Sequence, residues 1–304
     1  MSIELPEMHH FGIVVPDLDG AMDDLSSQLG LTWAPVRHGE RTVRHHGRLV
    51  TTDLRLTYSM EGPPHLELIG QARGTPWEPT GGGIHHAGFW VPDLRGAGRL
   101  LARAGMTLEA TYDAEDGGLL GFAYFTDVNG FRVEILDDSR RQSFDEWLAG
   151  GPGHIAGISH TALAVPDLET AMSFYGDALG LTWARPQQRA ISIRVAAGDL
   201  TTEIRFTYSR QGPPHLELIE GAAGTVWAPV SGLHHIGLWS HRLEIDAARL
   251  QHRGMSLEVA GLSRSGRQPS GFTYHRSAHG LRVELVDTAS QPAFERWFAG
   301  GDLR

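Results

Sequence analysis

The chain of 304 residues contains no cysteine, and all 26 of its basic residues are arginine. Without cysteine there is no disulfide, thiolate nucleophile or cysteine-bound zinc site. Without lysine, neither a Schiff base nor a P-loop can form. Positive charge is also scarce, because the formal net charge is -10. This balance argues against nucleic acid or an anionic membrane as a partner.

Long apolar runs are absent as well. No stretch approaches the ~20 residues that a transmembrane helix needs, and the first ten residues lack the basic-then-apolar pattern of a secretory signal. We therefore expect a cytoplasmic location. Hydrophobic residues make up 41% of the chain and charged residues 20%, which is typical of a globular protein with room for two domains.

The sequence repeats itself at an offset of 149 or 150 residues. "VVPDLDGAMDDLSSQLGLTWA" returns as "AVPDLETAMSFYGDALGLTWA", "TYSMEGPPHLELI" as "TYSRQGPPHLELI", and "GFRVEILD" as "GLRVELVD". A repeat of this length indicates a tandem duplication. We predict domains at 1–150 and 155–304, joined by a linker at Gly151–Ala156.

Each predicted domain is itself double, because "HHFGIVVPDL" at His9 resembles "HHAGFWVPDL" at His85. Apolar spacing predicts a strand at 10–15, a helix that ends at Gly30, and strands at 51–59 and 65–69. The second module is predicted to have a strand at 87–91, a helix at 94–104, strands at 122–126 and 131–136, and a turn at 127–130. Residues 37–48 and 186–198 are expected to be loops. The chain is thus predicted to be α+β, with four βαβββ modules at about 8–70, 84–138, 158–220 and 233–288.

Every module carries a His at the start of its first strand and a Glu in its last, spaced by 57, 48, 57 and 49 residues. These eight residues are His10, Glu67, His86, Glu134, His160, Glu217, His235 and Glu284. His and Glu are suitable ligands for a divalent transition metal. Burying a lone carboxylate in an apolar strand is costly without such a partner. Two facing modules would supply two His and two Glu to one ion.

Together, "HHxGxxVPDL", "LGLTW" and "NGFRVEILD" resemble the vicinal oxygen chelate superfamily over nearly the whole chain. That group includes glyoxalase I, methylmalonyl-CoA epimerase, extradiol dioxygenases and the fosfomycin and bleomycin resistance proteins. The resemblance implies that two modules form a half-open, eight-stranded barrel around the metal. His10 and His86 stand seven residues before the Asp of "VPDL", as His160 does, so we choose the second His of each pair. His9, His85 and His234 are then expected on the opposite face, with structural roles.

Several features stay open from the sequence. The modules can pair within a half, or exchange partners across halves as some four-module glyoxalases do. The metal can be Zn, Ni, Co, Mn or Fe, with up to two ions per chain. The chain can be a monomer or a homodimer, and the expected partner is a small-molecule substrate.

The four-ligand set resembles the glyoxalase and epimerase branch, which moves a proton on the carbon next to a carbonyl. We therefore expect an epimerase, isomerase or lyase that acts on a small oxygen-rich compound, with Glu134 and Glu284 as both ligands and proton carriers. His65 and His215 are further catalytic candidates, because each shares a strand face with the Glu two residues along.

Two alternatives belong to other classes. An extradiol-type dioxygenase would hold iron in the second half through His160, His235 and Glu284, with Tyr274 and His275 as candidates for its further catalytic residues. A resistance-type binding protein would sequester a small molecule in an apolar pocket with little or no metal. The complete ligand sets in both halves argue against this last alternative.

Overall fold

The computed structural model describes residues 8–79, 83–148, 158–221, 224–263 and 269–303. The chain separates into two compact units, one built on the first half and one on the second. The predicted linker at Gly151–Ala156 lies outside the described residues. We keep the boundaries 1–150 and 155–304 as our proposal for the domain division.

In the first unit each module has the predicted order of one strand, one helix and further strands. Its strands are β1 (Met8–Val15), β2 (Arg37–His45), β3 (Arg48–Tyr58), β4 (His65–Gly70), β5 (His86–Val91), β6 (Thr107–Tyr112), β7 (Phe122–Thr126) and β8 (Arg132–Asp137). Its helices are α1 (Leu18–Leu29), α2 (Leu94–Arg103), the short η1 (Asp138–Arg140) and α3 (Arg141–Leu148). Each module is thus a βαβββ unit, and the first unit ends with an added helix.

The second unit repeats this order. Its strands are β9 (Ile158–Val165), β10 (Gln187–Val195), β11 (Gly198–Tyr208), β12 (His215–Glu220), β13 (His235–Ser240), β14 (Ser256–Gly261), β15 (Phe272–Arg276) and β16 (Arg282–Asp287). Its helices are α4 (Leu168–Leu179), α5 (Leu243–His252), η2 (Thr288–Ser290) and α6 (Gln291–Phe298).

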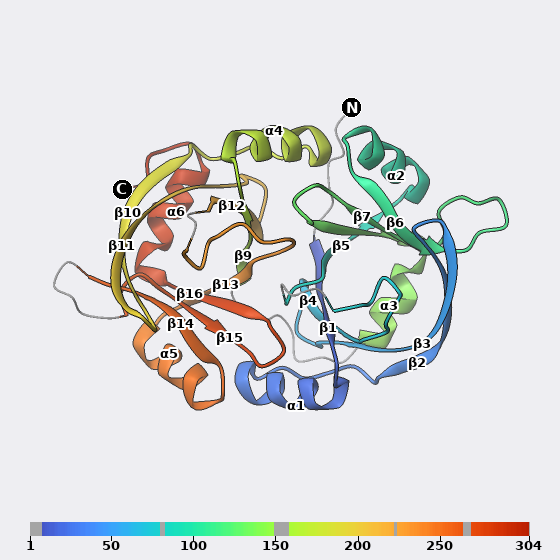
Figure 1. Cartoon of the computed structure of the whole chain (residues 1–304), viewed down its shortest axis with the longest axis horizontal. Helices are drawn as coiled ribbons and strands as arrows, with labels where there is room; N and C mark the ends of the chain where they lie inside the picture. The colour runs from blue at the N-terminus through green and yellow to red at the C-terminus, as the bar shows by residue number, and fades with distance from the viewer. Residues whose placement is uncertain (1–7, 80–82, 149–157, 222–223, 264–268, 304) are drawn as a thin grey trace. The chain divides into compact units, whose positions relative to one another are not determined.

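Each unit forms its own eight-stranded barrel of mixed strands (Figure 1). The first has the order β1-β4-β3-β2-β6-β7-β8-β5 and the second β10-β11-β12-β9-β13-β16-β15-β14. Modules therefore pair within a half: β1 lies antiparallel to β5, and three residue pairs between β2 and β6 close the first ladder. The predicted fold class of paired modules is confirmed.

The predicted helix ends are also confirmed. The Asp17 side chain accepts a hydrogen bond from the Gly20 backbone nitrogen at 3.1 Å and so caps α1. The helix ends at Gly30, whose φ of 76° lies in the left-handed region that favours glycine. The turn at 127–130 forms as well, because Asp127 Oδ1 accepts hydrogen bonds from Asn129 and Phe131.

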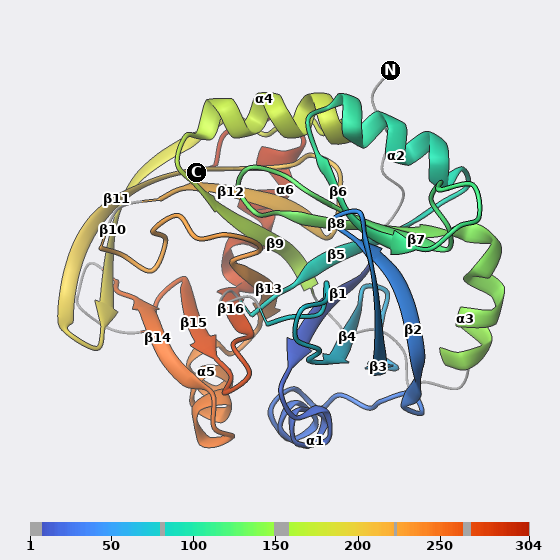
Figure 2. The ribbon, with the colours of Figure 1, turned by 45° about the vertical axis from the view of Figure 1, so that its right-hand side comes forward.

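The expected loops at 37–48 and 186–198 are wrong, because both segments lie in long antiparallel hairpins, β2–β3 and β10–β11. Residues on both faces of β2 are polar, so it lacks the apolar alternation that marks a strand. Figure 2 shows the β2–β3 hairpin and, beside it, helix α3, which the sequence analysis did not assign. Trp147 of α3 donates a hydrogen bond to the Pro35 carbonyl oxygen at 3.1 Å, which holds α3 against the start of β2.

Among the helices of the described residues, none has both the length and the apolar character needed to cross a membrane.

Candidate metal centres

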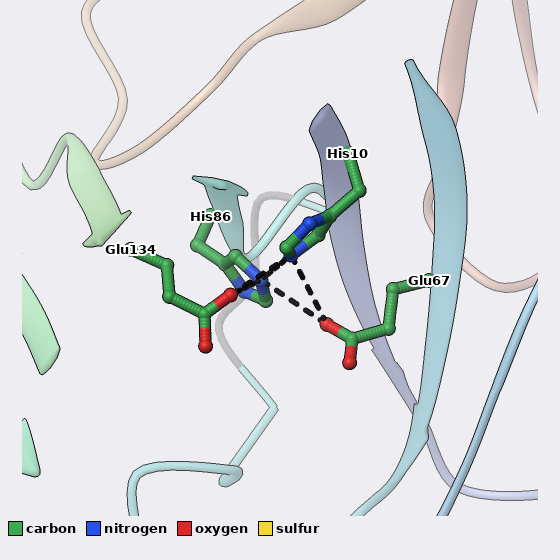
Figure 3. Close-up of side chains that lie close together, drawn as sticks. All are labelled: His10, Glu67, His86 and Glu134. Atoms are coloured by element: carbon green, nitrogen blue, oxygen red, sulfur yellow. Dashed lines mark hydrogen bonds and ion pairs between the residues drawn. The ribbon is translucent and has the colours of Figure 1, made fainter. Parts of the chain in front are cut away.

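The first barrel brings its four predicted ligands together from four adjacent strands. His10 and His86 lie on the paired strands β1 and β5, and Glu67 and Glu134 lie on the flanking strands β4 and β8. Figure 3 shows the two carboxylates pointing toward the two imidazoles. All four residues are buried, so the cluster lies inside the barrel.

The ligand atoms lie within contact distance of one another. The Nε2 atoms of His10 and His86 are 2.8 Å apart. Glu134 Oε2 lies 2.9 Å from His10 Nε2 and 3.3 Å from His86 Nε2. Glu67 Oε2 lies 3.1 Å from His86 Nε2 and 3.6 Å from His10 Nε2. Four donor atoms thus surround one point.

The second barrel reproduces this arrangement. The Nε2 atoms of His160 and His235 are 3.0 Å apart. Glu284 Oε2 lies 2.8 Å from His160 Nε2 and 3.3 Å from His235 Nε2. Glu217 Oε2 lies 3.5 Å from His160 Nε2 and 3.3 Å from His235 Nε2. Each half therefore carries a buried group of two His and two Glu that is suited to a metal ion.

Glycines two residues after the histidines make room for the rings. A Cβ at Gly88 would lie 2.0 Å from Cε1 of His10, and one at Gly12 would lie 2.0 Å from Cε1 of His86. Gly237 has the same relation to His160. Three of the four imidazoles therefore pack flat over a glycine of the neighbouring strand, which explains the H-x-G pattern at His10, His86 and His235. His160 is followed by Ala162, which pairs with His235.

Replacing Gly88 with Ala is expected to displace the His10 ring. The overpacking should lower the free energy of unfolding by about 1–3 kcal/mol and remove metal binding from the first half only. Metal analysis and thermal unfolding measure the two effects. Gly70→Ala is the control, because the nearest atom to its added Cβ would be 3.5 Å away. Full metal content in Gly88→Ala would contradict this account.

The histidines that precede two of the ligands fix their tautomers. His85 Nε2 lies 2.8 Å from the Pro76 carbonyl oxygen, which can only accept, so this nitrogen carries the proton. His85 Nδ1 then accepts from Nδ1 of His86 at 2.9 Å, so in the neutral His86 ring the lone pair is on Nε2, which faces the cluster. Burial has the largest effect on the pKa of His85 and, together with the charge of Arg132, keeps it well below its usual value. His85 therefore stays neutral.

The second half has the same relay, since His234 bonds to the Val226 carbonyl oxygen and to Nδ1 of His235, both at 2.8 Å. Nδ1 of His10 lies 3.0 Å from Nδ1 of His9, and Nδ1 of His160 lies 2.8 Å from Ser159 Oγ. The expectation that His9, His85 and His234 lie on the opposite face is thus wrong. They support the candidate ligands by hydrogen bonds, as partners of metal-binding histidines commonly do.

The charges of the cluster fit a divalent cation. The Oε2 atoms of Glu67, Glu134, Glu217 and Glu284 are buried, and none has a hydrogen-bond donor in the described part of the chain. Burial would lower the pKa of His86, but the carboxylate of Glu134 outweighs it and raises this pKa to about 9. Burial would raise the pKa of Glu134, but the imidazoles of His86 and His10 lower it to about 2. A site that favours positive charge this strongly suits an ion in place of the proton.

A cavity leads to each cluster. The first, of about 270 Å³, is lined by Glu67 and Glu134 together with Trp77 and the tyrosines opposite the two carboxylates, Tyr58 and Tyr124. The matching cavity of the second barrel, of about 250 Å³, is lined by Glu217, Glu284, Trp227, Tyr208 and Tyr274. Burial raises the pKa of all four tyrosines well above 10, so they remain neutral.

Part of the cavity wall was not predicted from the sequence. Arg37 and Arg41 of β2, Arg140 of η1, and Phe144 and Trp147 of α3 all line the first cavity. The repeated "SFDEWLAGG" and "AFERWFAGG" segments were the available signal for the aromatic pair. The arginines have no equivalent in the second half, so the internal repeat gave no signal for them.

His65 and His215 lie beside the clusters but outside the four-residue groups. Their Nδ1 atoms lie 2.8 and 2.7 Å from the carbonyl oxygens of Ser59 and Ser209. Since a carbonyl only accepts, Nε2 of each ring has the lone pair. Burial lowers the pKa of both histidines, so both are neutral bases at pH 7.

Two further groups in the described part of the chain have residue types that can bind a metal, and one of them, Asp167, Glu169 and Glu220, is largely exposed and acidic. His45, His46 and Glu109 lie together at the turn of the β2–β3 hairpin. However, the Glu109 carboxylate already accepts two hydrogen bonds of 2.7 Å from Arg132. We assign no ion to this group.

His275 does not line the cavity, unlike its neighbour Tyr274. It is fully buried, with Nε2 3.0 Å from Thr273 Oγ1, and burial lowers its pKa from 6.5 to about 4. Because its folded-state pKa lies below the unfolded value, its stabilising effect is complete above pH 6.5 and is lost as the pH falls toward 4.

This loss should amount to roughly 3 kcal/mol in the free energy of unfolding. Phe125 occupies the equivalent position in the first half, so His275→Phe is the natural comparison. Urea unfolding at pH 7, 5.5 and 4 is expected to show a shallower acid loss in the variant. Identical pH dependence of the two proteins would show that His275 is not buried as a neutral group.

Three comparisons with known proteins bear on this geometry. Residues 9–144 and 159–274 match the family model of the Glyoxalase/Bleomycin resistance protein/Dioxygenase superfamily. Mitochondrial methylmalonyl-CoA epimerase from Homo sapiens is 27% identical over 158 residues, covering 50% of this chain and 84% of the epimerase.

Solved structures share the fold at low identity. A triple mutant of 4-hydroxymandelate synthase from Streptomyces coelicolor has a TM-score of 0.60 at 15% identity and covers 94% of this chain and 93% of the synthase. The Mn(II)-bound glyoxalase from Novosphingobium aromaticivorans has a TM-score of 0.54 at 16% identity, covering 93% and 82%. With both halves matched by the family model and both folded as paired βαβββ modules, the chain belongs to the Glyoxalase/Bleomycin resistance protein/Dioxygenase superfamily.

Proposed function

We propose that the protein is a divalent-metal-dependent enzyme that moves a proton on the carbon next to a carbonyl group, as an epimerase, isomerase or lyase. Its ligands would be His10, Glu67, His86 and Glu134 in the first half, and His160, Glu217, His235 and Glu284 in the second. The observation that best supports this proposal is the second carboxylate, which completes a four-residue cluster in both halves.

The number of protein ligands favours this reaction over ring cleavage with oxygen. Four ligands leave two positions of a six-coordinate ion, enough for two adjacent oxygens of a substrate. A set of two His and one carboxylate leaves three positions of the ion open, as in non-haem iron oxygenases. Glu217 stands in the cluster of the second half, where the dioxygenase alternative needs only His160, His235 and Glu284. The relative described as methylmalonyl-CoA epimerase gives further support to proton transfer.

Glu134 and Glu284 are our proposed proton carriers. When bound, the ion acts as a Lewis acid that makes the hydrogen next to the carbonyl acidic. The carboxylate takes this proton while the electron pair of the C–H bond moves toward the carbonyl oxygen. Delivery of a proton to the other face by the second carboxylate of the cluster, Glu67 or Glu217, gives epimerisation, and return of the proton to a neighbouring atom gives isomerisation. Buried tyrosine and tryptophan side chains form the cavity wall beside these carboxylates.

His65 and His215 remain proposed as general bases, as hydrogen-bond partners of the ligands or as substrate contacts, since both are neutral with Nε2 unprotonated. The choice among Zn, Ni, Co, Mn and Fe, the cytoplasmic location, and a monomer or homodimer also remain proposals.

Proton exchange with solvent tests the function. Metal-loaded and chelator-treated protein are incubated in D₂O with a panel of 2-oxo and 2-hydroxy acids and their thioesters, and NMR follows the loss of each C–H signal next to the carbonyl. We expect metal-dependent deuterium incorporation in at least one compound. Metal-dependent oxygen uptake with a catechol, without deuterium incorporation, would favour the dioxygenase. Absence of both reactions, together with tight binding of an apolar compound, would favour the binding protein.

A further inference from the structure

The two cavities share their inner walls but differ at their outer ends. Around the clusters, both have the same pairs of glutamates and tyrosines and one tryptophan. Farther out, Arg37, Arg41 and Arg140 of the first half are replaced by Gln187, Ile191 and Ser290 of the second. Three positions that have arginine in the first half thus have neutral side chains in the second half.

The three arginines face the cavity without an acidic partner. Arg37 Cζ lies 3.8 Å from the centre of the Trp147 ring, and Arg140 Cζ lies 5.7 Å from that of Tyr112. None of the three forms an ion pair with a carboxylate in the described part of the chain. Their neighbours Arg44 and Arg55 are paired, with Asp113 and Asp19.

Local structure directs these side chains to one place. Arg37 and Arg41 are four residues apart on β2, so they share a strand face, and both line the cavity with Arg140. Stacking on Trp147 holds Arg37, because a guanidinium binds well to an aromatic face. The hydrogen bond from Trp147 to Pro35 ties that ring to the same strand.

The formal charges favour an anionic ligand. With an ion bound, the carboxylates of Glu67 and Glu134 balance its double charge, and three uncompensated guanidinium groups remain. Guanidinium groups in a partly enclosed cavity bind carboxylate and phosphate groups with charge-assisted hydrogen bonds. At about 270 Å³ the cavity suits a small metabolite.

The second cavity offers an apolar wall instead. Ile191 stands in place of Arg41 and lines it with Leu303, beside Ile204 and Phe206, whose equivalents in the first cavity are Leu54 and Leu56. Arg189 also lines it, but its guanidinium is bonded to the Leu303 carbonyl oxygen at 2.7 Å and to Gln187 Oε1 at 2.8 Å. Among the described residues, the one cationic side chain that lines this cavity is therefore held by two neutral acceptors.

Resting on the proposed function, we propose that the two halves take substrates of different charge. The first half accepts a compound whose adjacent oxygens chelate the metal and whose other end is a carboxylate or phosphate bound by Arg37, Arg41 and Arg140. The second half accepts a chelating compound whose other end is uncharged and apolar.

Two probes of equal shape test this proposal by calorimetry. 2-Oxoglutarate and 5-methyl-2-oxohexanoate share a chelating end and differ by a carboxylate against an isopropyl group. Metal-loaded Glu284→Gln isolates the first site, and Glu134→Gln the second. At the first site we expect the dianion to bind about tenfold tighter or more, with the preference weakened by salt. At the second site we expect the opposite order.

The matched variant gives the first half the outer wall of the second, through Arg37→Gln, Arg41→Ile and Arg140→Ser. It should keep its metal and lose the preference for the dianion. An unchanged preference in this variant, or equal affinity for both probes at the first site of the parent, would overturn the proposal. 2-Oxo-4-phosphonobutanoate then shows which oxyanion binds better.

Failure of the proposed function gives a separate result. If neither site binds metal, that function fails, and glutarate titrated into the metal-free protein decides the inference about the arginines. Binding that disappears in the triple variant supports it, and equal or absent binding in both proteins overturns it. Normal metal content without charge discrimination overturns the inference alone.

Discussion

Replacing Glu134 with Gln is expected to lower the metal content from about two ions per chain to about one, because the amide removes one of the anionic ligands. Glu134 Oε2 is the carboxylate oxygen nearest to His10 Nε2, at 2.9 Å, and is buried. The neutral amide also cannot accept the substrate proton, so deuterium exchange at the first site should fall by about 10²-fold or more. Elemental analysis and the NMR exchange assay measure the two effects.

Glu284→Gln is the matched variant, since Glu284 Oε2 lies 2.8 Å from His160 Nε2 in the second half. It should lose the other ion, and the double variant should lose both. Glu109→Gln controls for the loss of a buried carboxylate elsewhere, because Glu109 pairs with Arg132 outside the cluster. A single variant that loses both ions, or keeps both, would contradict two independent centres.

Removing the metal is expected to destabilise the protein strongly. An ion present at about 1,000 times its Kd stabilises the folded state by about 4 kcal/mol. For a unit of this size that corresponds to a fall in Tm of roughly 10 °C on chelation. The reason is the group of carboxylate oxygens that are buried without hydrogen-bond donors. Scanning calorimetry with EDTA, and again after metal is restored, measures the shift.

The Glu134→Gln/Glu284→Gln double variant is the control for this shift. It should unfold at one temperature regardless of EDTA or added metal, because neither cluster can hold an ion. Equal Tm values for the unmodified protein with and without metal would show that the clusters bind no ion of structural consequence.

The fold and the two clusters were predictable because the βαβββ pattern, with one His and one Glu, occurs four times in the sequence. Recurrence of one His and one Glu at nearly constant spacing, in strands that are otherwise apolar, marked all eight cluster residues. Strands β2 and β6 were not predictable, since polar residues occupy both faces of β2 and Leu108 of β6 is exposed. Barrel closure, not hydrophobic alternation, determines their structure.

The supporting histidines were missed because strict alternation fails where they lie. His9 stands at a register shift in the pairing of β1 with β5, so neighbouring side chains no longer point to opposite faces. His85 and His234 come just before strands β5 and β13, where alternation does not apply. The cavity arginines were missed because the duplicate lacks them, and only the fold places Arg140 near β2.

The most direct test of the two centres is a crystal structure of the metal-loaded protein with anomalous data collected at the metal edge. We predict one peak in each half, about 2.0–2.2 Å from the histidine Nε2 atoms and the nearest glutamate oxygens. The expected neighbours are His10, Glu67, His86 and Glu134 in the first half, and their equivalents in the second. Peaks only elsewhere, such as at His45, His46 and Glu109, or no peak in saturating metal, would contradict the assignment.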